Sequence, residues 1–149
     1  HTLVEQAWIR AGAFAHQQII WAKSNGVMGR SHYRWAHEPC LYGWIRGNQP
    51  PKRGQDMPST VWSIEGMAKV SETLHPTSKP LGGFTIPMDQ HTRRGEICYE
   101  PFSGSGSQLV AGESCGRLVY GMERAPEYVA VILERASRLG LEPTLEEGS

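Results

Sequence analysis

The sequence lacks the features that mark several specialised classes of protein. No stretch approaches the roughly 18 consecutive apolar residues that a membrane span needs, and no secretory signal is present. The three cysteines, Cys40, Cys98 and Cys115, are odd in number and widely spaced, which argues against a disulfide framework and suits a reducing cytosol. The formal net charge is zero, so the overall charge predicts no polyanionic partner. We therefore expect a cytoplasmic protein with no membrane partner.

Glycine and proline, by contrast, are plentiful. The 149 residues include 17 glycines and 10 prolines, and 39% are hydrophobic, which is typical of a loop-rich globular domain rather than a disordered chain. This length suits one domain and is enough to bury a core, so we expect residues 1–149 to form a single domain. The chain begins with His1 rather than Met, and we expect it to be the later part of a longer polypeptide.

The charges cancel but are unevenly distributed. Between residues 23 and 55 the only acid is Glu38, whereas the bases are Lys23, Arg30, Arg34, Arg46, Lys52 and Arg53. Acids outnumber bases from residue 113 onward. A polyanion would therefore meet the first half of the chain. On charge alone, a solvated basic loop is an equally good interpretation.

The first part of the chain predicts a helix, a short strand and a hairpin. Residues 2–15 have the apolar spacing of a helix, and QQIIWAK at 17–23 is typical of a buried strand. Residues 33–45 alternate loosely around Pro39, as an edge hairpin or an irregular strand pair does.

A loop and a second helix are expected in the middle of the chain. Proline, glycine and polar residues predict a loop over 46–60. A helix is expected after the proline-bounded segment 75–80 and extends to about His91. Its sequence is a poor helix former, because Gly82 and Gly83 each cost about 1 kcal/mol relative to alanine.

The last third predicts strand, glycine turn, helix, strand and helix. Strands are expected at 95–102 and 117–123, joined by SGSGS at 103–107 and a helix over 108–115. Pro126 opens a further helix with one apolar stripe. Such a βαβ unit has parallel strands and a right-handed crossover. The fold class expected is therefore α/β.

The glycine turn and the acid after the second strand predict a nucleoside-cofactor site. Gly104 and Gly106 expose the main chain at a helix start, and Glu123 stands where an acid accepts hydrogen bonds from ribose hydroxyls. Leu109 replaces the third glycine of a dinucleotide fingerprint, which argues against nicotinamide or flavin and against close approach of the helix. Glu100, just before the turn, suits an ammonium group, so the charges best match S-adenosylmethionine. An ordinary βα turn with a surface glutamate is the alternative.

These segments together resemble a known enzyme family. The resemblance is carried by HPTSKP at 75–80, EPFSGSGS at 100–107 and YGMERAPEYVAVILERA at 120–136, with weaker matches in IIWAKSNG at 19–26 and YRWAHEPCLYG at 33–43. The order is similar to that of the DNA amino-methyltransferases specific for adenine N6 or cytosine N4, in the permuted subgroup whose cofactor half is C-terminal. The resemblance implies a prokaryotic or phage protein with a Rossmann-like S-adenosylmethionine-dependent methyltransferase fold, a mostly parallel sheet and helices on both faces. It also implies double-stranded DNA with a flipped target base as the substrate.

The resemblance also assigns cofactor contacts. It places Glu100 at the methionine amino group, Glu123 at the ribose and Met122 beside the adenine. The family often has Asp where this chain has Ala125, which is expected to weaken a helix cap. The segment 75–80, taken alone, is better explained as a rigid turn bounded by prolines. The residues expected to bind S-adenosylmethionine are His75, Thr77, Lys79, Glu100, Phe102, Ser103, Gly104, Ser105, Gly106, Ser107, Met122 and Glu123.

One motif of the family is missing. Its catalytic tetrapeptide, Asp/Asn/Ser-Pro-Pro-Tyr/Phe/Trp, holds the target amine, but the only paired prolines, Pro50 and Pro51, have no acid before them and no aromatic after them. We therefore expect no catalytic residue in this chain and a second chain or upstream segment that supplies the motif. In the family the strand with this motif lies between the strand ending at Tyr99 and the strand at 17–23, so each would have an unpaired edge here. The sheet should be incomplete.

The basic first half contains the candidate DNA contacts. The family carries target recognition between about 46 and 73, a segment short enough here to predict a short recognition site or help from another chain. Trp21 and Trp35 are expected in the core. The predicted DNA-binding residues are Arg46, Lys52 and Arg53 for phosphates, with Trp44 and Trp62 for stacking on either side of the basic loop.

Two functions of different classes remain open. The leading one is a site-specific, restriction–modification type DNA methyltransferase, or its cofactor-binding and DNA-recognition part, acting on an exocyclic amine of adenine or cytosine. The alternative is a catalytically inactive methyltransferase-like module that binds DNA or a partner. A nicotinamide-dependent oxidoreductase is disfavoured by Leu109, and the spacing of His32, His37 and Cys40 does not predict a zinc site.

Overall fold

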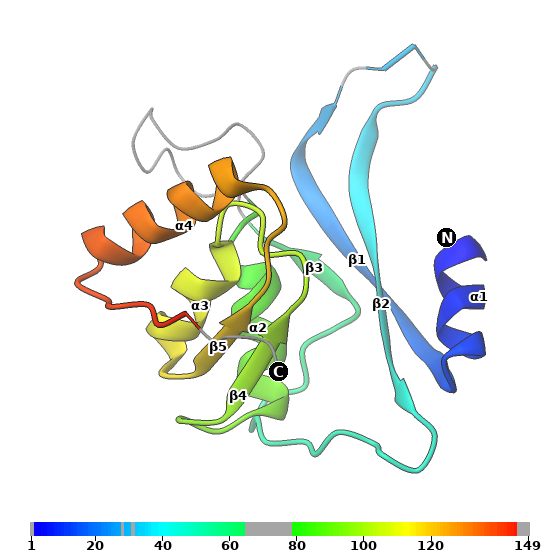
Figure 1. Cartoon of the computed structure of the whole chain (residues 1–149). Coiled ribbons are helices and arrows are strands. Elements are labelled where there is room, and N and C mark those ends of the chain that lie inside the picture. The colour runs from blue at the N-terminus through cyan, green and yellow to red at the C-terminus, as the bar shows by residue number, and fades with distance from the viewer. Residues whose placement is uncertain (1, 28, 31, 65–78, 146–149) are drawn as a thin grey trace.

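The computed structural model describes residues 2–27, 29–30, 32–64 and 79–145. Strands β2, β1 and β3 form one sheet in that order, and β4 and β5 form another (Figure 1). The elements in chain order are α1 (Thr2–Arg10), β1 (Ala13–Val27), β2 (Trp35–Ile45), β3 (Val61–Ser63), α2 (Gly82–His91), β4 (Ile97–Glu100), α3 (Ser107–Cys115), β5 (Leu118–Gly121) and α4 (Pro126–Arg138).

A long antiparallel hairpin makes up most of the first sheet. β1 pairs with β2 from Ala13, opposite Ile45, almost to its far end. The hairpin or irregular strand pair expected within residues 33–45 is wrong, because Trp35–Ile45 is one continuous strand whose partner is β1. β2 is an edge strand, so Pro39 can sit opposite Ile20 without removing a hydrogen bond from the interior of the sheet. The basic loop, residues 46–60, leads from β2 to β3.

Gly12 separates the first helix from the first strand. It has φ 83°, the left-handed conformation that commonly ends a helix, so α1 ends at Arg10 rather than extending over the expected 2–15. Pairing with β2 then keeps the following chain extended, which makes β1 longer than the short strand expected. Trp8 packs α1 onto the hairpin so closely that a Cβ added at Gly43 would lie 2.9 Å from its ring.

The second sheet is the expected βαβ unit. β4 and β5 pair in parallel, and α3 connects them (Figure 1). Gly116, with φ 68°, ends α3 as predicted. Met88 of α2 forms a buried core with Ala111 and Cys115 of α3. The core of this half therefore lies between the two helices and the sheet.

Close packing of α3 on β5 depends on Gly112. A Cβ added there would overlap the side chain of Val119. Close packing is therefore found at Gly112, whereas the expectation from Leu109 concerned the third position of the dinucleotide fingerprint. The close contact comes about one helical turn later, where the sequence again has glycine.

Arg117 joins the C-terminal ends of α2 and α3. Its side chain is 8% exposed, and its guanidinium lies 3.1 Å from the carboxylate of Asp89. The guanidinium also donates to the carbonyl of Thr92 at 2.9 Å and to its hydroxyl at 3.0 Å. A buried charge needs such partners, so this residue fixes the end of α2 in place.

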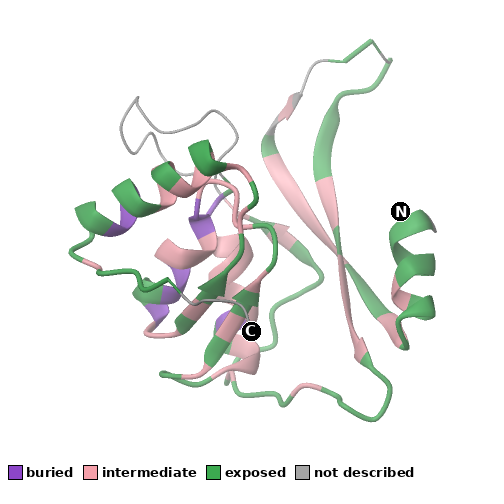
Figure 2. Ribbon diagram, viewed as in Figure 1, coloured by how far each residue is buried: buried purple, intermediate pink, exposed green. Residues whose placement is uncertain are grey.

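One face of the β4–β5 sheet is uncovered in the described part of the chain. Ile97, Tyr99, Leu118 and Tyr120 alternate onto this face and are 43% to 60% exposed, while α2 and α3 pack on the other face (Figure 2). β4 has a single partner, β5, among the described strands. No large side chain in these ranges is fully buried.

Two further expectations for the first sheet are wrong. β1 does not leave its second edge free, because β3 pairs with it in parallel over Ile20–Ala22. Trp35 does not enter a core, because it starts β2 near the tip of the hairpin and is 64% exposed. The class is α/β and Rossmann-like as expected, but it is partial, and its longest ladder, β1–β2, is antiparallel.

Candidate cofactor and nucleic-acid sites

The chain turns from β4 into α3 through residues 101–106, called the glycine loop below. Gly104 and Gly106 have φ values of 52° and 76°, which a residue with a Cβ adopts only at a cost. At Gly106 space is also short, because an added Cβ would lie 3.1 Å from Cγ1 of Ile132 on α4. Glycine is therefore needed for the turn and for the packing of α4 against it.

Two acids at the strand ends fasten this loop. Glu100, at the end of β4, accepts the N–H of Phe102 at 2.8 Å. Glu123, just after β5, accepts the N–H of Gly104 at 2.8 Å. Both acids that the sequence singled out therefore lie at the glycine loop.

Glu123 also binds the start of α4. Its second oxygen accepts the N–H of Ala125 at 2.9 Å, so the backbone at the helix start is bonded although Asp is absent from position 125. The hydrogen bonds from Ala125 and Gly104 lower the pKa of Glu123, which keeps it ionised at neutral pH. A carboxylate has about four lone-pair sites, so Glu123 can still accept ligand hydroxyls.

A cavity of about 260 Å³ opens beside the glycine loop. In the described part of the chain, its charged side chains are one base, Lys79, and one acid, Glu100. Small-molecule sites commonly measure about 300–1,000 Å³, so this cavity suits one end of a nucleoside cofactor rather than all of it. The lining consists of Lys79, Phe84, Glu100, Phe102, Ser103, Gly104, Ser105, Ser107, Gln108 and Tyr128.

The sequence did not identify three of these residues. Phe84 and Tyr128 lie at apolar helix positions that indicate core packing, and Gln108 follows the motif by one residue. Among the predicted residues, His75 and Thr77 lie outside the described part of the chain.

Ser107 has a buried hydroxyl in this cavity. The residue is 5% exposed, and its Oγ has no hydrogen-bond partner among the described residues. Such an unpaired group costs roughly 1–3 kcal/mol. Ser107 is the first residue of α3, whose first N–H groups also have no partner inside the helix. A carboxylate ligand would satisfy both, so the residues present fit the methionine end of S-adenosylmethionine.

Arg135 of α4 binds the backbone of the glycine loop. It was not identified from the sequence. It is 8% exposed and donates from Nη1 to the carbonyl of Ser105 at 2.5 Å. The signal was available, because Arg135 falls on the same helical stripe as Tyr128, Ile132 and Leu139. A charged residue on an apolar stripe needs a buried polar partner.

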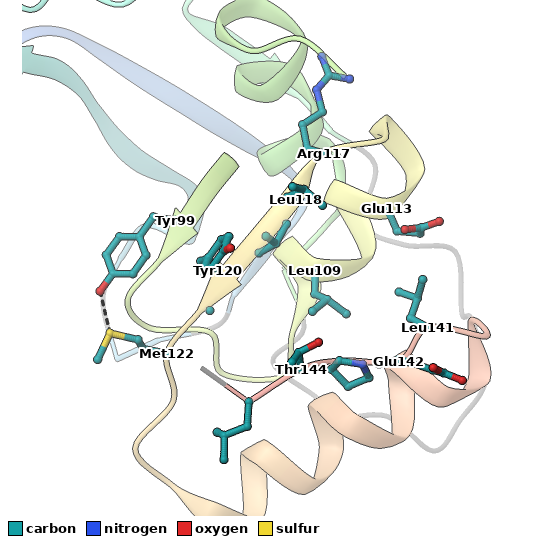
Figure 3. Close-up of a pocket in the computed structure, with 15 residues that line it drawn as sticks. Tyr99, Leu109, Glu113, Arg117, Leu118, Tyr120, Met122, Leu141, Glu142 and Thr144 are labelled. Carbon is teal, nitrogen blue, oxygen red and sulfur yellow. Dashed lines mark hydrogen bonds between the residues drawn. The ribbon is translucent and has the colours of Figure 1, made fainter. Parts of the chain in front are cut away.

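Met122 lies apart from the smaller cavity. It accepts a hydrogen bond at 2.7 Å from the hydroxyl of Tyr99 and borders a larger cavity of about 670 Å³ (Figure 3). That cavity lies between β5, the helices α3 and α4, and residues 141–145, with Leu109 on the α3 side (Figure 3). None of residues 102–107 lines it, so the chemistry of the glycine loop belongs to the smaller cavity.

Trp44 and Arg46 lie together in a group of rings at one end of the hairpin. The Trp44 ring centroid is 5.0 Å from that of Phe14, 4.7 Å from His16 and 5.4 Å from Tyr42. The guanidinium of Arg46 lies over the Phe14 ring at 4.8 Å. Aromatic faces and a cation are thus combined at this end, as nucleic-acid contacts require.

The basic loop is anchored on the C-terminal end of α2. The carbonyl of Gln90 accepts the N–H of Arg53 at 2.6 Å, and its side chain donates to the carbonyl of Asp56 at 3.1 Å. The guanidinium of Arg53 lies 3.5 Å from a carboxylate oxygen of Glu96, and Lys52 is exposed. These cations therefore lie on a loop that hydrogen bonds and an ion pair hold in a defined conformation.

Trp62 is separated from the other predicted DNA residues. It lies on β3 opposite Trp21, whereas Trp44 pairs with Phe14. At about 3.3 Å per residue, these two positions on β1 are roughly 23 Å apart. The indole N–H of Trp62 donates to the carbonyl of Ser59 at 2.8 Å. The two tryptophans therefore lie on strands at opposite edges of the sheet, one at each end of the basic loop.

The described residues contain neither a metal-binding cluster nor a membrane-spanning helix. No group of three or more His, Cys, Asp or Glu residues in the described ranges is arranged to hold a metal ion. No helix in that part of the chain combines the length and hydropathy needed to cross a bilayer.

The sequence is similar to known DNA methylases. A family model described as DNA methylase matches residues 4–134. The chain is 29% identical over 124 residues to the type II methyltransferase M2.MboI of Moraxella bovis, an alignment that covers 82% of this chain and 41% of the relative. It is 27% identical over 126 residues to the type II methyltransferase M2.DpnII of Streptococcus pneumoniae, covering 82% and 43%. The chain spans about half the length of the curated relatives it matches, or less.

Solved structures share the fold. The chain matches the M1.HpyAVI–SAM complex with a TM-score of 0.75 and 22% identity, over 90% of this chain and 68% of that one. It matches the cytosine-N4-specific PvuII DNA methyltransferase with a TM-score of 0.76 and 15% identity, over 90% and 55%. At these identities the likeness establishes the α/β fold.

Proposed function

Since the chain belongs to the DNA methylase family, we propose that it is the cofactor-binding and DNA-recognition part of a site-specific DNA methyltransferase. The reaction is methyl transfer from S-adenosylmethionine to an exocyclic amine of adenine or cytosine. The observation that carries this proposal is the glycine loop, where Glu123 accepts the N–H of Gly104 and the buried hydroxyl of Ser107 has no partner among the described residues.

Each part of the donor is assigned to a residue at or near the loop. Glu100 receives the α-amino group, and Ser107 at the start of α3 receives the α-carboxylate together with Lys79. Glu123 accepts the ribose hydroxyls, and Met122 lies beside the adenine, outside the smaller cavity. The bound donor supplies an activated methyl group on a sulfonium.

A strand that carries the catalytic tetrapeptide completes the sheet beside β4, from an upstream segment or a second chain. Two observations support this. The second edge of β4 is unpaired among the described strands, and a row of unpaired backbone groups there would be costly if buried. The adjacent face, with Tyr99 and Tyr120, is largely exposed and apolar. Exposed apolar patches of this kind commonly mark a surface that binds another segment or chain.

The DNA lies along the end of the hairpin that carries Trp44, Arg46 and the basic loop. Lys52 and Arg53 bind phosphates and set the position of the duplex, while the segment 46–73 recognises the target. The target base is flipped toward the donor, because an amine inside the duplex cannot align with the methyl group. The setting is the cytoplasm of a prokaryote or a phage-infected cell.

Donor binding tests this proposal. The chain is titrated with S-adenosylmethionine and with a nicotinamide dinucleotide, alongside Glu123→Ala and the matched control Glu127→Ala, an acid in the first turn of α4. We expect the donor to bind, the dinucleotide not to bind, and Glu123→Ala alone to weaken donor binding by about tenfold or more. A preference for the dinucleotide, or equal affinities for the two variants, would refute the assignment.

A further inference from the structure

An ionic cluster joins the hairpin to the segment that leads into α2. Glu38 on β2 lies 2.6 Å from the ammonium of Lys23 on β1 and 2.8 Å from that of Lys79. Hydrogen bonds from Lys23 and Lys79 lower the pKa of Glu38, so the carboxylate is ionised at neutral pH. Two ammonium groups and one carboxylate leave one net positive charge in the cluster.

Trp21 forms the apolar side of this cluster. The ammonium of Lys23 lies 5.3 Å from its ring centroid and that of Lys79 lies 5.7 Å from it, both within cation–π range. The ammonium of Lys79 is therefore held by a carboxylate and by an aromatic ring, although its side chain is 55% exposed. A free lysine of that exposure would sample many rotamers.

Of the two lysines, Lys79 also lines the cavity beside the glycine loop. Among the described lining residues it is the single base, and in the proposed site it binds the methionine carboxylate. Lys23 shares the same carboxylate and the same ring but does not line the cavity. The two lysines therefore differ in whether they line the cavity that is proposed to bind the donor.

We propose that Glu38 is a positioning residue, which holds the ammonium of Lys79 at the cavity so that it binds the carboxylate of the methyl donor. This inference rests on the proposed function. Glu38 and the ring of Trp21 together hold the ammonium of Lys79 in place. The hairpin, although it lies outside the βαβ unit, thereby contributes to donor selectivity.

The test compares two ligands across four variants. S-adenosylmethionine has the α-carboxylate, whereas 5′-methylthioadenosine keeps the adenosine and lacks the amino and carboxyl groups. The variants are Glu38→Gln, Lys79→Met, the double variant, and Lys23→Met as the matched control. Affinities are measured by calorimetry on the chain at low ionic strength, where screening is weak.

We expect Lys79→Met to weaken S-adenosylmethionine binding about threefold to tenfold and Glu38→Gln about twofold to fivefold. The double variant should be no weaker than Lys79→Met, Lys23→Met should change affinity less than twofold, and no variant should alter 5′-methylthioadenosine binding.

Three outcomes would overturn the assignment of Glu38. They are equal effects on both ligands, an effect of Glu38→Gln that persists without Lys79, or an effect of Lys23→Met as large as that of Lys79→Met. If the unaltered chain binds neither ligand, the proposed function fails as well.

Discussion

Replacing Gly106 with alanine tests whether the glycine loop depends on backbone conformation and on close packing of α4. Gly106 has φ 76°, and an added Cβ would lie 3.1 Å from Cγ1 of Ile132. Gly104 is the matched control. It has φ 52°, and the nearest atom to its added Cβ is a carbonyl oxygen of the loop at 3.9 Å. The two substitutions share the strain and differ in the contact.

The expected losses of stability follow from the backbone strain and from the contact with Ile132. A left-handed conformation costs a residue with a Cβ about 1–2 kcal/mol, and loss of glycine's unfolded-state freedom offsets about 0.4–1 kcal/mol of it. Gly104→Ala should therefore destabilise the fold by about 1 kcal/mol. Overpacking typically costs about 1–3 kcal/mol, and the contact with Ile132 is a mild case. Gly106→Ala should then cost about 2 kcal/mol.

Urea unfolding of both variants measures this difference, and Ile132→Ala separates the terms. Removing Cγ1 of Ile132 relieves the contact, so the combination with Gly106→Ala should be about 1 kcal/mol less destabilised than the sum of the single variants. The combination with Gly104→Ala should be additive. If Gly106→Ala costs no more than Gly104→Ala, or if Ile132→Ala gives no relief, the contact between the loop and α4 has been misjudged.

Three further outcomes are expected. Arg135→Met should destabilise the chain by about 1–3 kcal/mol in urea unfolding, because the part-buried carbonyl of Ser105 loses a charged donor; a loss below about 0.5 kcal/mol would contradict this. The lowered pKa of Glu123 means that its stabilising contribution is present above the ordinary value of 4.5 and is lost as the pH falls through the lower folded-state pKa. Glu123→Gln should therefore lose less stability than the unaltered chain during acid unfolding, and an equal loss would count against the backbone hydrogen bonds. Gln90→Ala removes the bond to the carbonyl of Asp56, so trypsin should cut the basic loop several-fold faster, whereas unchanged cleavage would show that the side chain does not anchor the loop.

The βαβ unit was predictable because its signals are local. Glycines in left-handed conformations, at Gly104, Gly106 and Gly116, lie where the sequence predicts a turn or a helix end. Pro126 opens α4 as expected. Each of these signals acts within a few residues, so the local sequence determines where the turn lies and where the helix begins or ends.

Features that depend on distant partners were less predictable. The length of β1 comes from pairing with β2, and the exposure of Trp35 follows from its place at the hairpin tip. The contact of Arg135 with the glycine loop spans 30 residues. Sequence patterns give the face on which a residue lies, but they do not give what packs against that face.

Both ends of α2 are tied to the hairpin and the basic loop. Lys79, which precedes α2, binds Glu38 on β2, and at the other end the His91 ring stacks on Tyr42 at 5.2 Å and an interplanar angle of 14°. The carbonyl of Gln90 accepts two N–H groups of the basic loop. Because α2 also packs on α3 through Met88 and lines the cavity beside the glycine loop through Phe84, the proposed donor and DNA surfaces share one helix. The spacing between the two sheets is therefore set by contacts within this chain, so a completing strand beside β4 would enter a space that already has a defined width.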